Sequence, residues 1–480
     1  MSHMPITATK TDRFSSGSAE AVPRAVLGLR GVIALIVGVV IGAGIFKAPA
    51  MVAGMTGNTT WMFGAWVLGG IMSLIGALCY AELTTAYSHA GGDYHFLYRA
   101  YGRSVSFLFG WARFSVITTG SIALLAFVFG DYMSQVLPLN MFGAAWSSSL
   151  YAAAIVIVLS WVNLRGIKAG ISTQTWLTAV EVGGLLLIVV AGLFVAGNGG
   201  STALPQGISA APGPASFGLA MVFVLLTYGG WNEAAYISAE LKDAQHNMVK
   251  ALVASILIIT ALYLLVTWAY WKGLGLEGMA KSDAMAADLL RIAFGPIGEK
   301  IISVMVAISA LTSINATMIV GARTNYAVGR DWPALRGLAR WDEARGSPAN
   351  AMCIQCIAAL LLVMLGAWTG SGFKSMVEFT APVFWLFFLL SGVSLFVLRV
   401  RDPATERPFK VPLFPLLPLL FCAMCAYMLW ASLSYVYSQS LGGLNAAWIG
   451  VAVLAVGLVL LLLMRTLPVN HKQSVSHVKS

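Results

Sequence analysis

The hexapeptide Ile41–Phe46, with the sequence IGAGIF, lies in the middle of an apolar run that extends from Val26 to Ala53. A glycine inside a helix costs about 1 kcal/mol relative to alanine, so a plain membrane anchor would avoid two of them at mid-span. In hydrocarbon, backbone groups freed by a break are costly unless they face protein or a water-filled cavity. The hexapeptide therefore predicts a helix that is interrupted within the membrane, at a place where something binds.

The composition around this segment is that of a polytopic membrane protein. Of 480 residues, 59% are apolar and only 10% are charged, which lies far outside the range of soluble globular domains. Runs of roughly 20 apolar residues can span a bilayer as helices. We expect twelve such runs in a single all-α transmembrane domain at 26–466, near residues 27–53, 61–86, 104–136, 149–163, 171–197, 216–238, 247–272, 299–329, 349–369, 374–399, 411–437 and 443–465.

The net charge of +10 raises the possibility of a nucleic-acid partner, but the placement of the basic residues argues against it. If both termini are cytoplasmic, most of the lysines and arginines fall on the cytoplasmic side of the twelve runs. This asymmetry is the positive-inside rule, and the basic surface then faces anionic lipid. We expect an integral protein of the cytoplasmic (inner) membrane that binds no nucleic acid.

The cysteines do not suggest metal or redox chemistry. Cys353 and Cys356, like Cys422 and Cys425, have C-x-x-C spacing, but both pairs lie inside apolar runs without a nearby histidine or carboxylate. No cysteine falls in an outside loop, so we expect no disulfide-linked partner subunit. Catalytic triads, phosphate loops and dinucleotide fingerprints are absent from the sequence. We therefore expect no cofactor, no metal site and no enzymatic activity.

A second glycine interruption occurs in the sixth run, where Thr227–Glu233 reads TYGGWNE. Matching breaks in the first and sixth segments are the signature of an inverted repeat of five helices plus five, with a substrate site at the repeat interface. The alternative is that these glycines form helix-packing faces. Packing explains single glycines, but not two mid-span clusters that are flanked by aromatic and polar residues.

The physics of such breaks suggests the ligand. A half-helix that begins near Ala43–Phe46 directs free N–H groups and the positive end of its dipole into the gap, which suits a carboxylate. Half-helices that end near Ile41 and Thr227–Gly229 expose carbonyl groups, which suit an ammonium group. A zwitterion satisfies both sets, and an α-amino acid is the simplest such molecule.

The chain resembles the amino acid–polyamine–organocation (APC) transporter superfamily, nearest its L-type amino acid transporter branch and bacterial relatives. The resemblance covers nearly the whole chain. It is carried by GAGIF at 42–46 and YGGWN at 228–232, by AEL at 81–83 with the tyrosines and glycines of 87–102, and by Arg323 with GRD at 329–331.

The resemblance implies the twelve-helix LeuT-type fold. Its inverted repeats would occupy about 27–197 and 216–400, two extra helices would occupy 411–466, and cytoplasmic tails would occupy 1–25 and 467–480. Helices one and six would be unwound around the substrate.

The resemblance also implies site residues by position. The substrate carboxylate would be held by the amides of Ala43, Gly44 and Ile45, and the amine by carbonyls near Val40, Ile41, Leu226, Thr227 and Gly229. Many relatives carry a gating aromatic residue at the position of Leu226, so Tyr228 or Trp231 would have to substitute for it or would serve only in packing. The remaining lining or gating residues would be Gly42, Phe46, Gly230, Ile117 and Ser121 in the third run, and Ser313 and Asn315 in the eighth.

Charged residues inside the apolar runs are costly and usually functional. We predict an ion pair between Arg113 in the third run and Glu181 in the fifth, where relatives commonly carry a lysine. Two interpretations of the pair are open, a static bridge and a group that takes a proton or cation during transport. Glu233 either helps to recognise a cationic group or fixes the unwound loop, and Lys47 either pairs with an acidic residue or reaches water.

These observations favour a secondary transporter that moves amino acids by alternating access, with the substrate bound at the two breaks and a proton or sodium ion as the coupling ion. A carrier of polyamines or other organic cations is the alternative within the same fold. A membrane receptor or channel would also explain twelve spans, but not paired breaks that offer both an anion site and a cation site.

Overall fold

A computed structural model describes residues 29–87, 92–139, 144–165, 171–197, 211–233, 244–340, 348–438 and 446–466. Every regular element in these ranges is helical, and nine of their helices are long and apolar enough to cross a membrane. The predicted all-α polytopic class is therefore confirmed. Both predicted tails, at 1–25 and 467–480, and residues 234–243, which follow the second break, lie outside the described residues.

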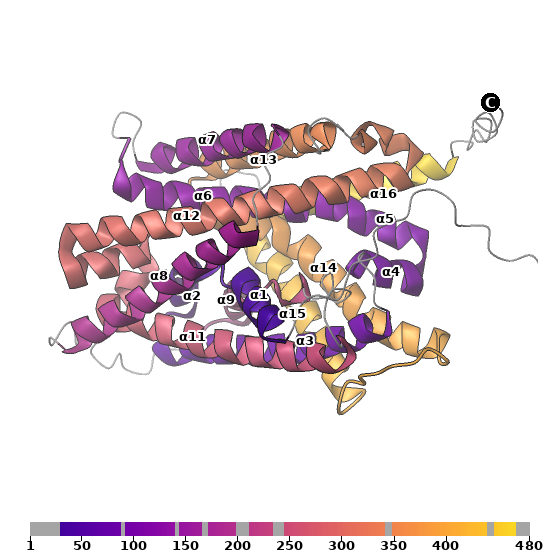
Figure 1. The fold of residues 1–480 in the computed structure, drawn as a ribbon, viewed down its shortest axis with the longest axis horizontal. Helices are drawn as coiled ribbons and strands as arrows, with labels where there is room; N and C mark the ends of the chain where they lie inside the picture. Colours follow the sequence, from indigo (N-terminus) through magenta and orange to yellow (C-terminus); the bar gives the residue numbers. More distant parts are fainter. Residues whose placement is uncertain are drawn as a thin grey trace, which may run out of the picture.

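The helices follow the predicted apolar runs along the chain (Figure 1). In the first half they are α1 (Leu29–Val40), η1 (Ala43–Phe46), α2 (Ala48–Thr56), α3 (Thr59–Ala86), α4 (Asp93–Tyr101), α5 (Arg103–Ala112), η2 (Arg113–Thr118), α6 (Thr119–Val136), α7 (Ala144–Leu164) and α8 (Ile171–Gly197). In the second half they are α9 (Pro214–Thr227), η4 (Trp231–Glu233), α11 (Ala244–Lys281), α12 (Met285–Asp331), η6 (Pro333–Ala339), α13 (Ala349–Thr369), α14 (Gly372–Arg401), α15 (Leu416–Ser438) and α16 (Ala446–Thr466).

The first apolar run is divided where its glycines predict. The α-helix α1 ends at Val40, a short 3-10 turn covers Ala43–Phe46, and the α-helix resumes as α2 at Ala48. The sixth run behaves in the same way, since α9 ends at Thr227 and a 3-10 turn begins at Trp231. Both predicted interruptions are therefore present.

The turn between α2 and α3 illustrates how local chemistry sets the helix ends. Gly57 ends α2 in the left-handed region at φ 58°, a conformation that glycine adopts without steric cost. Asn58 then caps α3, because its side-chain oxygen accepts hydrogen bonds from the amides of Thr60 at 2.8 Å and Trp61 at 3.3 Å. The second span thus starts immediately after the first one ends.

The broken helices lie at the centre of the molecule (Figure 1), with α6 and α12 on one side of them in this view and α3 and α11 on the other. Contacts join α1 to α11, α2 to both α9 and α11, and η1 to both α9 and α12. Large apolar side chains on the outer helices are exposed, for example Leu257, Leu361 and Met364, as expected of a surface that faces lipid. The breaks are therefore enclosed by protein rather than by hydrocarbon.

One buried carboxylate joins three segments at the end of α3. Glu82 is 2% exposed and accepts two hydrogen bonds from the Arg399 guanidinium of α14, Nε to Oε1 at 2.7 Å and Nη2 to Oε2 at 2.5 Å. Its Oε2 also accepts a hydrogen bond from the Val411 amide at 2.7 Å, and Arg407 Nε lies 3.6 Å from Oε1. Paired hydrogen bonds to a guanidinium fix both distance and orientation, so Glu82 holds the 402–415 connection against α3 and α14.

Glu82→Gln should strongly destabilise the protein. Removing one partner of a buried ion pair costs about 3–5 kcal/mol, because Arg399 and Arg407 would keep their charges without a carboxylate. We expect a markedly lower melting temperature in detergent. The matched control is Glu277→Gln, which removes a fully solvated partner of Lys281 (76% and 74% exposed) and should change the melting temperature little. Equal melting temperatures for Glu82→Gln and the wild type would contradict this role.

Candidate functional site

The two breaks meet each other directly. A Cβ atom placed on Gly44 would lie 3.3 Å from Thr227 Oγ1 and 3.5 Å from Thr227 Cα, so η1 packs closely against the end of α9 at this glycine. Gly42, by comparison, has nothing nearer than 4.0 Å. The second glycine of the GAG motif therefore lies where the two interrupted helices meet.

The predicted anion-binding amides lie in the η1 turn. Ala43 and Ile45 are fully buried, and the hydrogen bonds of the described residues include no acceptor for the amides of Ala43 and Gly44. The first N–H groups of a helical turn lack partners within the turn. The start of η1 therefore offers donors to a negatively charged group.

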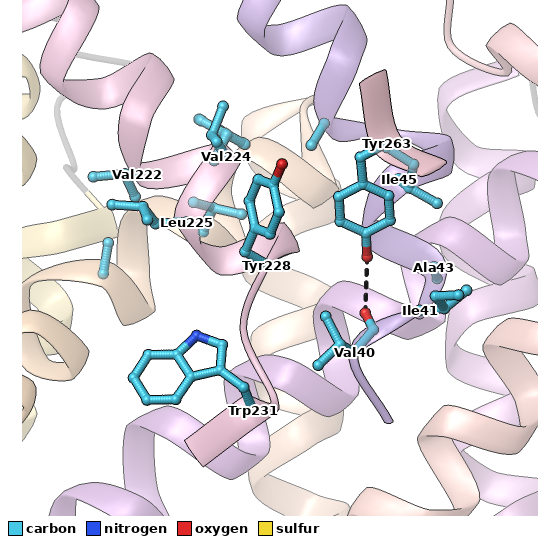
Figure 2. Close-up of a cluster of buried hydrophobic side chains, with 14 of the residues drawn as sticks. Val40, Ile41, Ala43, Ile45, Val222, Val224, Leu225, Tyr228, Trp231 and Tyr263 are labelled. Carbon is cyan, nitrogen blue, oxygen red and sulfur yellow. Dashed lines mark hydrogen bonds between the residues drawn. The ribbon is translucent and has the colours of Figure 1, made fainter. Parts of the chain in front are cut away.

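The predicted amine-binding carbonyls converge on a tyrosine that the sequence did not single out. Tyr263 of α11 is fully buried, and its hydroxyl lies 2.9 Å from Val40 O and 3.1 Å from Thr227 O. Figure 2 shows the ring between the two broken segments, with its hydroxyl directed at the Val40 carbonyl. One hydroxyl thus joins the last residue of α1 to the last residue of α9.

The rest of the second break is tied together locally. Leu226 O accepts a hydrogen bond from the Gly229 amide at 3.1 Å, and the Gly230 amide donates to Asn232 Oδ1 at 3.3 Å. Gly230 has φ 105°, outside the range of a helix. The stretch between α9 and η4 is therefore a defined turn.

Both aromatic residues proposed as substitutes for a gate at Leu226 are packed. Tyr228 is 1% exposed, donates a hydrogen bond to Trp66 O at 3.0 Å and lies against the ring of Tyr263. Trp231 is 4% exposed and contacts Tyr80 and Phe388, and in Figure 2 it points away from the α1 side of the gap. A packing role accounts for both side chains.

A small cavity lies beside the second break. Its volume for water-sized spheres is about 10 Å³, which is room for roughly one water molecule. Two of its polar lining atoms, Ser73 Oγ and Trp385 Nε1, have no hydrogen-bond partner among the described residues. The lining consists of Met72, Ser73, Leu225, Gly229, Trp231, Phe384, Trp385, Phe388 and Met424.

The residues assigned to lining on the third and eighth spans have different surroundings. Ile117 lies in η2, a π-helical turn of the kind that often marks functional sites, and its carbonyl accepts a hydrogen bond from Ser121 Oγ at 2.8 Å. Ser313 O accepts a hydrogen bond from Thr317. Asn315 instead joins α12 to α7, because its Oδ1 accepts a hydrogen bond from Asn163 Nδ2 at 2.7 Å.

The predicted charge pair is not among the ion pairs of the described residues. Glu181 is 4% exposed and accepts a hydrogen bond from Ser309 Oγ of α12 at 2.7 Å. Arg113 begins the η2 turn. Pairing of Arg113 with Glu181 stays a prediction, and the side chain of Glu233 lies outside the described residues.

Lys47 does find an acidic partner. Its Nζ lies 2.6 Å from Asp131 Oδ2 of α6, and the two side chains are 6% and 18% exposed. Phe46, the residue before it, accepts a hydrogen bond from Tyr132 through its carbonyl at 3.0 Å. Metal ligands do not gather here, since the described residues contain no group of three or more histidines, cysteines, aspartates and glutamates that could hold an ion.

Residues 27–461 match the family model described as amino acid permease. The b(0,+)-type amino acid transporter 1 of Homo sapiens is 29% identical over 406 residues, which covers 84% of this chain and 82% of the human protein. The serine/threonine exchanger SteT of Bacillus subtilis is 28% identical over 416 residues, with coverage of 85% and 91%. The large neutral amino acids transporter small subunit 2 of Mus musculus is 29% identical over 430 residues, with coverage of 87% and 78%.

The family match spans both breaks and nearly every helix of the described residues, and the relatives are the amino acid transporters of the branch that the motifs resemble. The chain therefore belongs to the amino acid permease family of the APC superfamily.

Proposed function

We propose that this protein is a secondary active transporter that carries amino acids across the cytoplasmic membrane by alternating access, with its substrate bound between the two breaks. The observation that carries the proposal is the meeting of η1 with the end of α9 around the Tyr263 hydroxyl. Two interrupted helices in contact, one offering amides and both offering carbonyls, form a site for a molecule with a carboxylate and an ammonium group.

The proposed architecture is the twelve-helix LeuT-type fold with a five-plus-five inverted repeat. The division of the first and sixth runs at matching positions supports it. Within this fold we place both termini in the cytoplasm, on the strength of the distribution of lysine and arginine. The predicted domain limits, a single domain at 26–466 between two tails, belong to the same proposal.

The substrate contacts follow from the polarity of the gap. The amides of Ala43, Gly44 and Ile45 would receive the carboxylate, with the positive end of the η1–α2 helix behind them. The carbonyls of Val40 and Thr227 would receive the ammonium group, together with those near Ile41, Leu226 and Gly229. Because the single hydrogen of the Tyr263 hydroxyl is shared between two of these carbonyls, the hydroxyl would lie beside the ammonium group and hold the carbonyls at the right spacing.

Related proteins support amino acids as the substrate class. The names of the bacterial and mammalian relatives specify serine and threonine in one case and large neutral amino acids in another. A polyamine carrier remains the second candidate, favoured by the acidic Glu181 and Glu233.

Proteoliposomes preloaded with a labelled amino acid test the proposal. External neutral amino acids should accelerate release of the label, whereas the methyl ester or the N-acetyl form of the same amino acid should act about tenfold more weakly or worse. Each derivative loses one charge-assisted set of hydrogen bonds, and such bonds contribute about 1.5–3 kcal/mol each. If polyamines alone accelerated transport and no external amino acid accelerated release of the label, the proposal would be overturned.

Tyr263→Phe should impair exchange without preventing folding. It removes the hydroxyl hydrogen that Val40 O and Thr227 O share, and such a hydrogen bond contributes about 0.5–1.5 kcal/mol. We expect an exchange rate in proteoliposomes that is lower by up to about tenfold. Tyr270→Phe is the matched control, because Tyr270 lies about two turns along the same helix and its buried hydroxyl has no partner among the described residues. Equal loss in both variants would argue against a role for the Tyr263 hydroxyl.

Glu181→Gln separates the two interpretations of that carboxylate. Its contact with Ser309 joins α8 to α12, which favours a static role. We expect the folded variant to melt at a lower temperature and to keep the dependence of amino acid uptake on a pH gradient. Ser309→Ala, which keeps the carboxylate, is the control. Loss of proton dependence in Glu181→Gln alone would assign coupling to Glu181.

A further inference from the structure

A cluster of polar groups lies just beyond the first break, on the side of the membrane that we assign to the outside. Lys47 Nζ donates to Asp131 Oδ2 at 2.6 Å and to the backbone carbonyl of Asp283 at 2.5 Å. The other carboxylate oxygen of Asp131 accepts a hydrogen bond from Ser148 Oγ at 2.5 Å. We call Lys47, Asp131, Ser148 and the Asp283 carbonyl the outer latch.

The outer latch joins four separate parts of the chain. Lys47 lies between η1 and α2, Asp131 lies in α6, Ser148 lies in α7, and Asp283 lies in the connection between α11 and α12. These segments are distant in sequence, and the bond from Lys47 to Asp283 spans 236 positions. Breaking the Lys47–Asp131 contact therefore removes the ion pair that ties the start of the outer half of the first broken helix to α6.

A second contact reinforces the same arrangement. Tyr132, adjacent to Asp131, donates a hydrogen bond to the carbonyl of Phe46 at 3.0 Å and accepts one from the Ala286 amide at 3.4 Å. Phe46 is the last residue of η1, the turn that carries the amides proposed for the substrate carboxylate. The position of those amides is thus fixed by the two residues on α6.

Burial makes each of the two charges, on Lys47 and on Asp131, depend on the other. Both side chains are largely buried, and a buried charge that loses its partner is strongly unfavourable. Such a pair is stable when closed, or when both groups are hydrated in a water-filled vestibule. It thus stabilises two discrete states, closed and open, rather than intermediate ones.

We propose that Lys47 and Asp131 are positioning residues that close the outer path to the substrate, holding η1 and α2 against α6 while the pair is intact. This inference rests on the proposed transport function, since it assigns a closed outer path to an alternating-access carrier. Opening towards the outside then requires the pair to separate and both groups to be hydrated.

The test measures access from the outside and needs no substrate, so it can fail or succeed independently of amino acid transport. Ala286→Cys introduces a thiol at a fully buried position beside Tyr132, and the protein without this change gives the background from its native cysteines. A membrane-impermeant methanethiosulfonate is applied from outside, and the labelling rate is measured. We expect Asp131→Asn to raise the rate about tenfold or more, because separation no longer breaks an ion pair.

The controls address folding and specificity. Glu277→Gln, which removes an exposed pair on the same side, should leave the labelling rate unchanged. The charge swap Lys47→Asp with Asp131→Lys should return the rate towards the wild type, which a loss of packing alone would not do. If Asp131→Asn does not give folded protein by size exclusion, Lys47→Gln takes its place, since it removes the other partner of the same ion pair. A wild-type labelling rate in whichever folded variant is used would overturn the proposal.

Discussion

The cost of unpaired backbone groups in a membrane is the constraint on which the rest of the structure depends. Interrupting α1 at Val40 and α9 at Thr227 leaves carbonyls that hydrocarbon cannot satisfy. The protein solves this by placing both breaks at the centre, in contact with each other, and by directing one buried hydroxyl at two of the freed carbonyls. Under the proposed function, the remaining groups are those that would bind the substrate.

Local features of the fold were predictable because they depend on neighbouring residues. Gly42, Gly44 and the glycines at 229–230 predict two interruptions, and α1 and α9 end next to them. The apolar runs likewise predict the membrane helices, since length and hydropathy suffice. The π-helical turn η2 has no such signal, because its sequence RFSVIT reads as ordinary helix.

The partners of the polar groups could not be predicted in the same way. Tyr263 bonds to Val40 across 223 positions and Arg399 to Glu82 across 317, and neither separation is encoded by a local pattern. From the sequence, a tyrosine at mid-span can be a packing residue or a hydrogen-bond donor. Its hydroxyl in an apolar helix indicates that it needs a polar partner, but not which one. Asn315, which the resemblance assigns to the lining, accepts a hydrogen bond from Asn163 of α7, a partner that only tertiary packing brings to it.

The distribution of charge favours a zwitterion over a polyamine. Ion pairs such as Lys47–Asp131 and Arg399–Glu82 occur beyond the break and at a helix end, whereas the groups described at the breaks are amides, carbonyls and a tyrosine hydroxyl. A ligand with a net charge that enters the region of the breaks would find no ionised partner among these groups, so its desolvation cost would not be compensated. An amino acid with a neutral side chain has a net charge of zero and pairs each of its charges with backbone dipoles of opposite sign. A polyamine would need carboxylates to compensate its charge, and the only described candidate on the fifth span, Glu181, already accepts a hydrogen bond from Ser309.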